Sequence, residues 1–226
     1  MARLSRVSVA SAIVLSACAA TASSATVVNL VLNGSFENNT AGTNQYNLTN
    51  SAFNSYMSNC TGFGRGYPAG GNGQIDIESN AAGSYGGDSG AGAWHICVVS
   101  NDALSMALSQ ALVAGQSYTV SFLARINNDF STGTGPLRIG TSSSATAFGT
   151  EVYDTGTLTA SWTRFTSTFV AGSGASFLTI AGNPANDNAS ESWMMVDDFS
   201  VTDAVPAPGA LALLGIAGLA GGRRRR

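Results

Sequence analysis

This chain offers few combinations of residues that could form a catalytic site. His95 is the only histidine, so a Ser-His-Asp or Cys-His site would have to use it. Asp76 and Glu78 stand two apart in the alternating run 74–78, which places both carboxylates on one face of a strand. Such a pair could serve glycoside hydrolysis, but solvated pairs of this kind also occur on strands. We therefore expect a non-catalytic protein and keep a polysaccharide-active enzyme as the third alternative.

The three cysteines indicate a structural disulfide rather than a metal centre. Cys18 lies in the apolar N-terminal segment, which leaves Cys60 and Cys97 as an even pair. In an oxidising compartment such a pair is expected to form a disulfide. The chain has no CxxC motif, and with one histidine it lacks the usual ligand set of a zinc site. The sequence thus predicts a Cys60–Cys97 disulfide and no transition-metal site.

Aromatic residues and one arginine are scattered through the glycine- and asparagine-rich stretch 33–92. Sugar-binding surfaces place aromatic rings against the apolar faces of sugars and bind the hydroxyls with amide, carboxylate and guanidinium groups. The alternative is that these rings fill small gaps in the core. The candidates for ligand binding are Tyr46, Tyr56, Phe63, Arg65, Tyr67 and Tyr85. Trp162 and Trp193 stand beside patterned strands, and we expect them to pack in the core or at its edge.

The N-terminal residues have the composition of a secretion signal. Arg3 and Arg6 are followed by an apolar run and then by small residues, an order typical of cleaved signals and too short for a stable membrane span. Leu15-Ser-Ala-Cys18 also resembles a lipobox, in which Cys18 would carry lipid, and both cleavage patterns stay open. Residues 1–25 are therefore predicted to be a signal peptide that directs export.

The C-terminal residues 205–226 combine a proline motif, an apolar run and a basic tail. The motif consists of Val205, Pro206, Ala207, Pro208 and Gly209, and the tail is Arg223–Arg226. The prolines end any preceding strand, and the arginines would stay on the cytoplasmic side of a membrane. This order resembles the PEP-CTERM sorting signal, which implies membrane insertion through the C-terminal helix and processing by an exosortase, a membrane-embedded cysteine protease. Ala207 stands where that family has glutamate, and a plain membrane tail is the alternative.

Residues 26–204, between these two ends, have the size of one domain. Four arginines against all 13 acidic residues give this part a net charge of −9. A surface of this sign repels nucleic acid and attracts cations. The sequence has no basic patch, so we expect no nucleic acid among its partners.

Short alternating segments bounded by glycine, asparagine or proline dominate the domain. The clearest is 117–125, in which Tyr118, Val120 and Phe122 share one face. Further strands are expected at 27–32, 74–78, 94–99, 137–139, 163–169, 176–180 and 194–201. Residues 104–109 alternate less cleanly. Outside the two ends, helical periodicity is confined to one or two turns that 102–111 could hold. Many short strands separated by turns predict an all-β sandwich.

Four segments, in this order, resemble the galactose-binding-like jelly rolls found in many carbohydrate-binding modules. They are 33–37 (NGSFE), 109–122 (SQALVAGQSYTVSF), 162–169 (WTRFTSTF) and 196–201 (VDDFSV). The resemblance implies a jelly-roll β-sandwich, flanked here by the signal peptide and the hydrophobic sorting helix. It also implies one structural Ca²⁺ between the first and last strands, with Glu37 and Asp197 or Asp198 as ligands. Solvated acids at the strand ends are the alternative.

The expected function is that of an exported, non-catalytic protein of the cell surface or extracellular matrix of a Gram-negative bacterium. The fold resemblance and the loop aromatics indicate that it binds or organises exopolysaccharide in a biofilm or envelope. A structural surface protein without a specific sugar site is the main alternative. One fold serves both roles, so the site must decide between them.

Overall fold

The computed structural model describes residues 27–65, 73–79, 91–99, 101–127, 131, 135–172, 174–182 and 192–204. The predicted signal peptide (1–25) and sorting segment (205–226) lie outside the described residues. Within the described ranges, no helix combines the length and hydrophobicity needed to cross a membrane.

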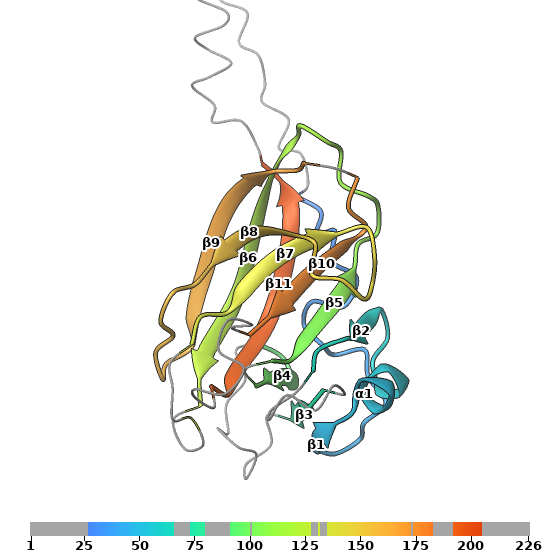
Figure 1. Cartoon of the computed structure of the whole chain (residues 1–226), viewed down its shortest axis with the longest axis vertical. Coiled ribbons are helices and arrows are strands. Elements are labelled where there is room, and N and C mark those ends of the chain that lie inside the picture. Colours follow the sequence, from blue (N-terminus) through green and yellow to red (C-terminus); the bar gives the residue numbers. More distant parts are fainter. Residues whose placement is uncertain are drawn as a thin grey trace, which may run out of the picture.

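Two antiparallel sheets pack face to face in the described part of the chain (Figure 1). The six-stranded sheet has the order β1 (Gln45–Leu48), β3 (Ile75–Ser79), β4 (Trp94–Val98), β11 (Met194–Asp203), β6 (Ser117–Ile126) and β9 (Thr163–Val170). The five-stranded sheet has the order β2 (Cys60–Gly62), β5 (Ala103–Ala107), β10 (Phe177–Ala181), β7 (Arg138–Ser142) and β8 (Thr150–Asp154). The one helix among the described residues, α1 (Asn50–Tyr56), lies beside β1 and β2 at one end of the sandwich. This architecture confirms the predicted all-β jelly-roll sandwich.

The core between the sheets follows from the alternation of side chains along each strand. In β6, Tyr118, Val120 and Phe122 point inward and are buried, and the residues between them lie half-buried or exposed on the outer face. The Phe122 ring stacks on Phe199 of β11, with the ring centroids 5.0 Å apart. Such ring pairs contribute about 0.5–1.5 kcal/mol beyond the area that they bury. The clearest strand of the sequence is therefore also the centre of the core.

The first described segment docks onto β11, whereas the sequence predicted a strand at 27–32. Gly34 accepts the N–H of Phe199 at 2.9 Å, and Leu30 donates to the carbonyl of Val201 at 2.8 Å. The pairing of β11 with β6 shifts register in this part of β11, and the bulge lets Phe199 turn to the first segment. The expected strand is thus reduced to docking contacts and one isolated bridge.

The two cysteines of the domain do not form the predicted disulfide, and both are free and buried. Cys60 lies in β2 of the five-stranded sheet and belongs to the core between the sheets. Cys97 lies in β4 of the six-stranded sheet and points away from that core, toward the outer face. The prediction was wrong because an even cysteine count says nothing about which face of which sheet each thiol occupies.

Candidate functional site

Alternation along β3 turns two acidic side chains away from the core. Ile75 and Ile77 are fully buried in the core, so Asp76 and Glu78 project from the outer face of the six-stranded sheet. Asp76 is only 4% exposed and Glu78 only 1%. The outer face is therefore covered at this point, and the shared face predicted for this acidic pair is confirmed.

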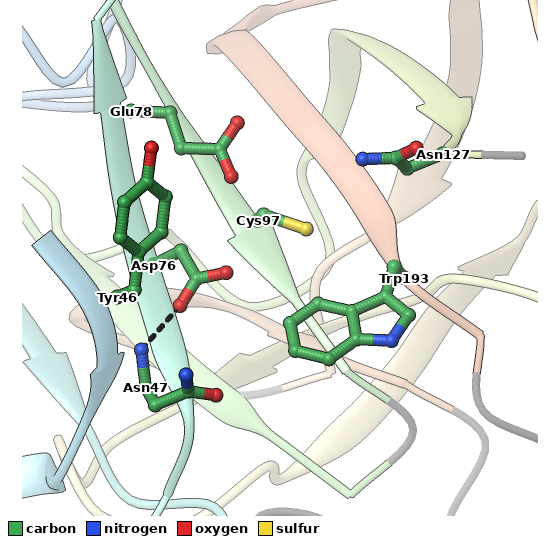
Figure 2. A pocket seen from close by; sticks show the side chains of 7 residues that line it. All are labelled: Tyr46, Asn47, Asp76, Glu78, Cys97, Asn127 and Trp193. Atoms are coloured by element: carbon green, nitrogen blue, oxygen red, sulfur yellow. Dashed lines mark hydrogen bonds between the residues drawn. The ribbon is translucent and has the colours of Figure 1, made fainter. Parts of the chain in front are cut away.

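A cavity of about 310 Å³ lies over these two acids. Its lining comes from five separate parts of the chain, namely Tyr46, Asn47, Asp76, Glu78, Cys97, Asn127 and Trp193. Figure 2 shows Tyr46 and Asn47 on one side and Trp193 and Asn127 on the other, with the acids and the thiol between them. Of the predicted ligand residues that the structure describes, Tyr46 alone lines this pocket.

Asp76 is held in place by the backbone of the neighbouring strand. Its Oδ1 accepts the N–H of Asn47 at 2.5 Å, and Asn47 has a left-handed backbone with φ of 51°. Burial raises the pKa of Asp76 to about 8 despite this hydrogen bond, and the nearby Glu78 and Asp102 carboxylates add to the rise. Asp76 can therefore carry a proton at neutral pH, when an ordinary aspartate is ionised.

Glu78 is oriented by the only histidine of the chain. Glu78 Oε2 lies 3.0 Å from His95 Nε2, and both side chains are buried. The His95 ring meets Trp162 edge-on at 5.7 Å, and the Arg125 guanidinium lies over the same Trp162 ring at 5.4 Å. This polar and aromatic cluster continues the outer face from β4 toward β6 and β9.

Cys97 completes the floor of the pocket, opposite Asp76 in the β3–β4 register. Burial raises the pKa of its thiol well above the ordinary value, and the neighbouring Asp76 and Glu78 carboxylates raise it further. The thiol is therefore protonated and unreactive unless a cation stabilises the thiolate.

The other predicted ligand residues lie elsewhere. Tyr56 on α1 packs against the core, and Tyr67 and Tyr85 lie outside the described residues. Phe63 and Arg65 line a second cavity of about 220 Å³, together with other residues that include Asn101. The Asn101 amide is buried there, and neither its oxygen nor its nitrogen has a hydrogen-bond partner.

The predicted calcium ligands divide into two groups. Glu37 Oε1 accepts the N–H groups of Ala93 and Trp94, and Asp197 Oδ2 accepts that of Ala91 at 2.7 Å, so both carboxylates hold one backbone segment. Asp198 instead pairs with Arg164 across the outer face. Burial raises the pKa of Asp197 to about 7. Glu37 and Asp197 thus remain the candidate ligands for a hard cation, whereas Asp198 pairs with Arg164.

Sequence reasoning missed four residues of the pocket. Trp193 was expected to pack in the core or at its edge, and Asn47, Cys97 and Asn127 were not considered as ligand residues. Trp193 immediately precedes β11 and Asn127 immediately follows β6, two paired strands. Polar or aromatic residues at the ends of predicted neighbouring strands are the signal that could have found Trp193 and Asn127.

Comparison with known proteins finds similarity to solved structures only. No family model and no curated protein matches the chain. Similar solved structures include the CBM22-1 xylan-binding domain of Paenibacillus barcinonensis Xyn10C (11% identity, TM-score 0.42, 77% of this chain and 94% of that chain). They also include a family 16 carbohydrate-binding module (16% identity, TM-score 0.43, 76% of this chain and 99% of that chain). A third is the K2 adhesin domain of Lys-gingipain (12% identity, TM-score 0.48, 76% of this chain and 97% of that chain). These likenesses, all with TM-scores below 0.5, do not assign a function to this chain.

Proposed function

We propose that this protein binds polysaccharide without cleaving it and that the pocket over β3 and β4 holds the saccharide. The lining of the pocket carries the proposal, because the rings of Tyr46 and Trp193 stand at its sides and Asp76, Glu78 and Asn127 offer polar groups to its interior. A sugar has apolar ring faces and a rim of hydroxyls, so it matches aromatic walls combined with planar hydrogen-bonding groups. The volume of the pocket lies at the small end of the range for ligand sites, about 300–1,000 Å³.

The charge of the site favours a neutral saccharide. Asp76 and Glu78 are acidic, and residues 26–204 carry a net charge of −9. A uronate or sulfate group entering this pocket would meet the negative field of the acidic domain, which disfavours binding. Hydroxyl groups, by contrast, can form hydrogen bonds with both carboxyl groups, whether or not Asp76 carries a proton.

Glycan-array binding by the full chain tests the proposal. Trp193→Ala and Tyr46→Ala should each weaken binding to neutral oligosaccharides by about tenfold or more, which corresponds to about 1.4 kcal/mol. Val170→Ala is the control, since Val170 is a 63% exposed apolar residue of β9 outside the pocket. Unchanged binding in both aromatic variants, with wild-type melting temperatures, would refute the assignment of this pocket.

The paired carboxylates make hydrolysis of the polysaccharide the alternative to binding alone. Polysaccharide incubated with the protein should release no reducing ends above background if the site only binds. Release that disappears in Asp76→Asn would instead establish a glycosidase, because a buried aspartic acid with a raised pKa can act as the general acid.

We further propose that the protein is exported and acts at the cell surface or in the extracellular matrix. The basic and apolar residues 1–25 and the proline motif, apolar run and arginine tail of 205–226 support this proposal. An exosortase-type protease is the proposed processing partner, acting after the C-terminal helix inserts into the membrane. Intact-mass measurement of the native secreted protein tests it, and a mature chain that still ends at Arg226 would contradict it.

A further inference from the structure

The floor of the pocket brings together three side chains of the kinds that ligate metals. Cys97 lies opposite Asp76 in the β3–β4 register, and Glu78 lies two residues further along the same face. One carboxylate oxygen of each acid and the Cys97 Sγ all lie within 4.8 Å of one another. Figure 2 shows the three side chains directed into the same space. We propose that Asp76, Glu78 and Cys97 bind a divalent metal ion with an affinity for sulfur, such as Zn²⁺.

Each of the three side chains keeps a potential ligand atom that the protein does not use. Asp76 Oδ1 accepts from Asn47 and Glu78 Oε2 lies against His95, which leaves Asp76 Oδ2 and Glu78 Oε1 without a hydrogen bond. The Cys97 thiol is 1% exposed and also has no hydrogen-bond partner. All three side chains line the same pocket, and a carboxylate oxygen of each acid lies close to the thiol sulfur, so one ion could contact all three.

The chemistry of the missing partner follows from the charges of the ligand atoms. Two carboxylates and a thiolate repel one another in a small buried volume, and a divalent cation reverses the sign of that interaction. Metal binding would displace the thiol proton, because the thiolate is the form of cysteine that ligates a metal ion. Ca²⁺ and Mg²⁺ prefer all-oxygen ligands, whereas a thiolate with carboxylates suits Zn²⁺ or Cd²⁺.

The surroundings of the three ligands fit a metal site with one open position. Asn47 and His95 each hold one ligand carboxylate through its second oxygen, which is how neighbouring groups commonly orient metal ligands. Three protein ligands leave the fourth position of a tetrahedral ion open toward Trp193 and Asn127. A water molecule or a saccharide hydroxyl could occupy that position, although metal binding does not depend on the saccharide.

Metal titration without any saccharide tests the proposal separately from polysaccharide binding. The full chain is used in a Cys18→Ser background, so that Cys60 and Cys97 are the only thiols. Calorimetric titration with Zn²⁺ should show one equivalent bound, and Cd²⁺ should produce the ultraviolet absorption of a cadmium–thiolate bond. Cys97→Ala should abolish the cadmium band and weaken Zn²⁺ binding by more than the roughly 10- to 100-fold that loss of an orienting neighbour costs.

Cys60→Ala is the matched control, because Cys60 is equally free but lies in the core away from the pocket. It should keep the cadmium band and wild-type Zn²⁺ affinity. Asp76→Asn keeps the size of the side chain and should weaken Zn²⁺ binding with the thiol intact, which decides the matter if Cys97→Ala does not fold. Wild-type Zn²⁺ affinity in Cys97→Ala or Asp76→Asn, loss of the band in Cys60→Ala, or competition by Mg²⁺ at equal concentration would overturn the proposal.

Discussion

Asn101 and Asp102 are neighbours in the chain and both are buried. The side chain of Asp102 forms hydrogen bonds, whereas that of Asn101 does not. The Asp102 carboxylate accepts the N–H groups of Gln74 at 2.7 Å and of Val99 at 3.0 Å. The Asn101 amide has no partner on either atom and belongs to the wall of the second cavity. A satisfied buried group contributes modestly to stability, whereas an unsatisfied one costs about 1–3 kcal/mol.

Replacing Asn101 with leucine should therefore stabilise the protein. Leucine has a similar shape and removes the buried amide, so we expect the free energy of unfolding to rise by about 1–2 kcal/mol in urea denaturation. Asn33→Leu is the matched control, because the buried Asn33 amide forms hydrogen bonds with Asn38 and Ser58. Removing that amide should destabilise the protein. A loss of stability in Asn101→Leu would show that the amide has a partner.

Asp102 should make stability depend on pH in a defined window. Burial raises its pKa from 3.8 to about 6, so the native state binds this proton more tightly than the unfolded state does. The stability that the Asp102 carboxyl adds to the native state is fully present below pH 3.8. It is lost as the pH rises through 6, and the total loss is about 3 kcal/mol. Unfolding measured between pH 4 and pH 7 should thus show a slope that is reduced in Asp102→Asn. If the curves of unfolding free energy against pH run parallel for the wild type and the variant, this prediction is refuted.

At the level of elements, the alternation of polar and apolar residues made the strands predictable, whereas it gave no signal for the short helix. The expected strand 117–125 is β6 (Ser117–Ile126), and 163–169 is β9 (Thr163–Val170). The helical turns considered at 102–111 do not form, because β5 (Ala103–Ala107) pairs between β2 and β10. Helix α1 was missed because seven polar-rich residues show no period, although Thr49 caps it by accepting the N–H of Ala52.

The docking of the first segment on β11 depends on a glycine. A Cβ at Gly34 would stand 2.0 Å from the carbonyl oxygen of Phe199, which is backbone and cannot move alone. Gly34→Ala should therefore lower the free energy of unfolding by about 2 kcal/mol or more. Gly172→Ala is the control, since its Cβ would meet nothing within 4 Å, and its effect should stay within about 0.5 kcal/mol. Equal stability of the two variants would contradict the close docking.

At the scale of the whole molecule, the fold was more predictable than the site. Strand periods are local, but Tyr46, Cys97, Asn127 and Trp193 come from distant parts of the chain and meet only through the strand order. Asp76 and Glu78 could be paired in advance because they share one strand. The disulfide prediction was wrong for the same reason that the metal ligands were missed. The face to which the Cys97 side chain points depends on which sheet β4 joins.

Calcium should stabilise the molecule if Glu37 and Asp197 share an ion between the first segment and the last strand. Binding to the native state alone adds about 3 kcal/mol at a hundredfold excess over the dissociation constant, so the melting temperature should rise with Ca²⁺. Glu37→Gln keeps an acceptor for the N–H groups of Ala93 and Trp94 and should abolish only this response. Mg²⁺ controls for simple screening of the acidic surface, and equal effects of the two ions would refute a specific site.

The central claim is that a saccharide lies against Trp193 in the pocket of the six-stranded sheet. The chain has three tryptophans, and their indole N–H signals can be followed by NMR while the best-bound neutral oligosaccharide from the array is added to the full chain. Trp193 lines the pocket, so its signal should shift progressively to saturation. The signal of Trp94, which packs against the core, should stay in place. A Trp193 signal that does not move at saturating saccharide would contradict the account.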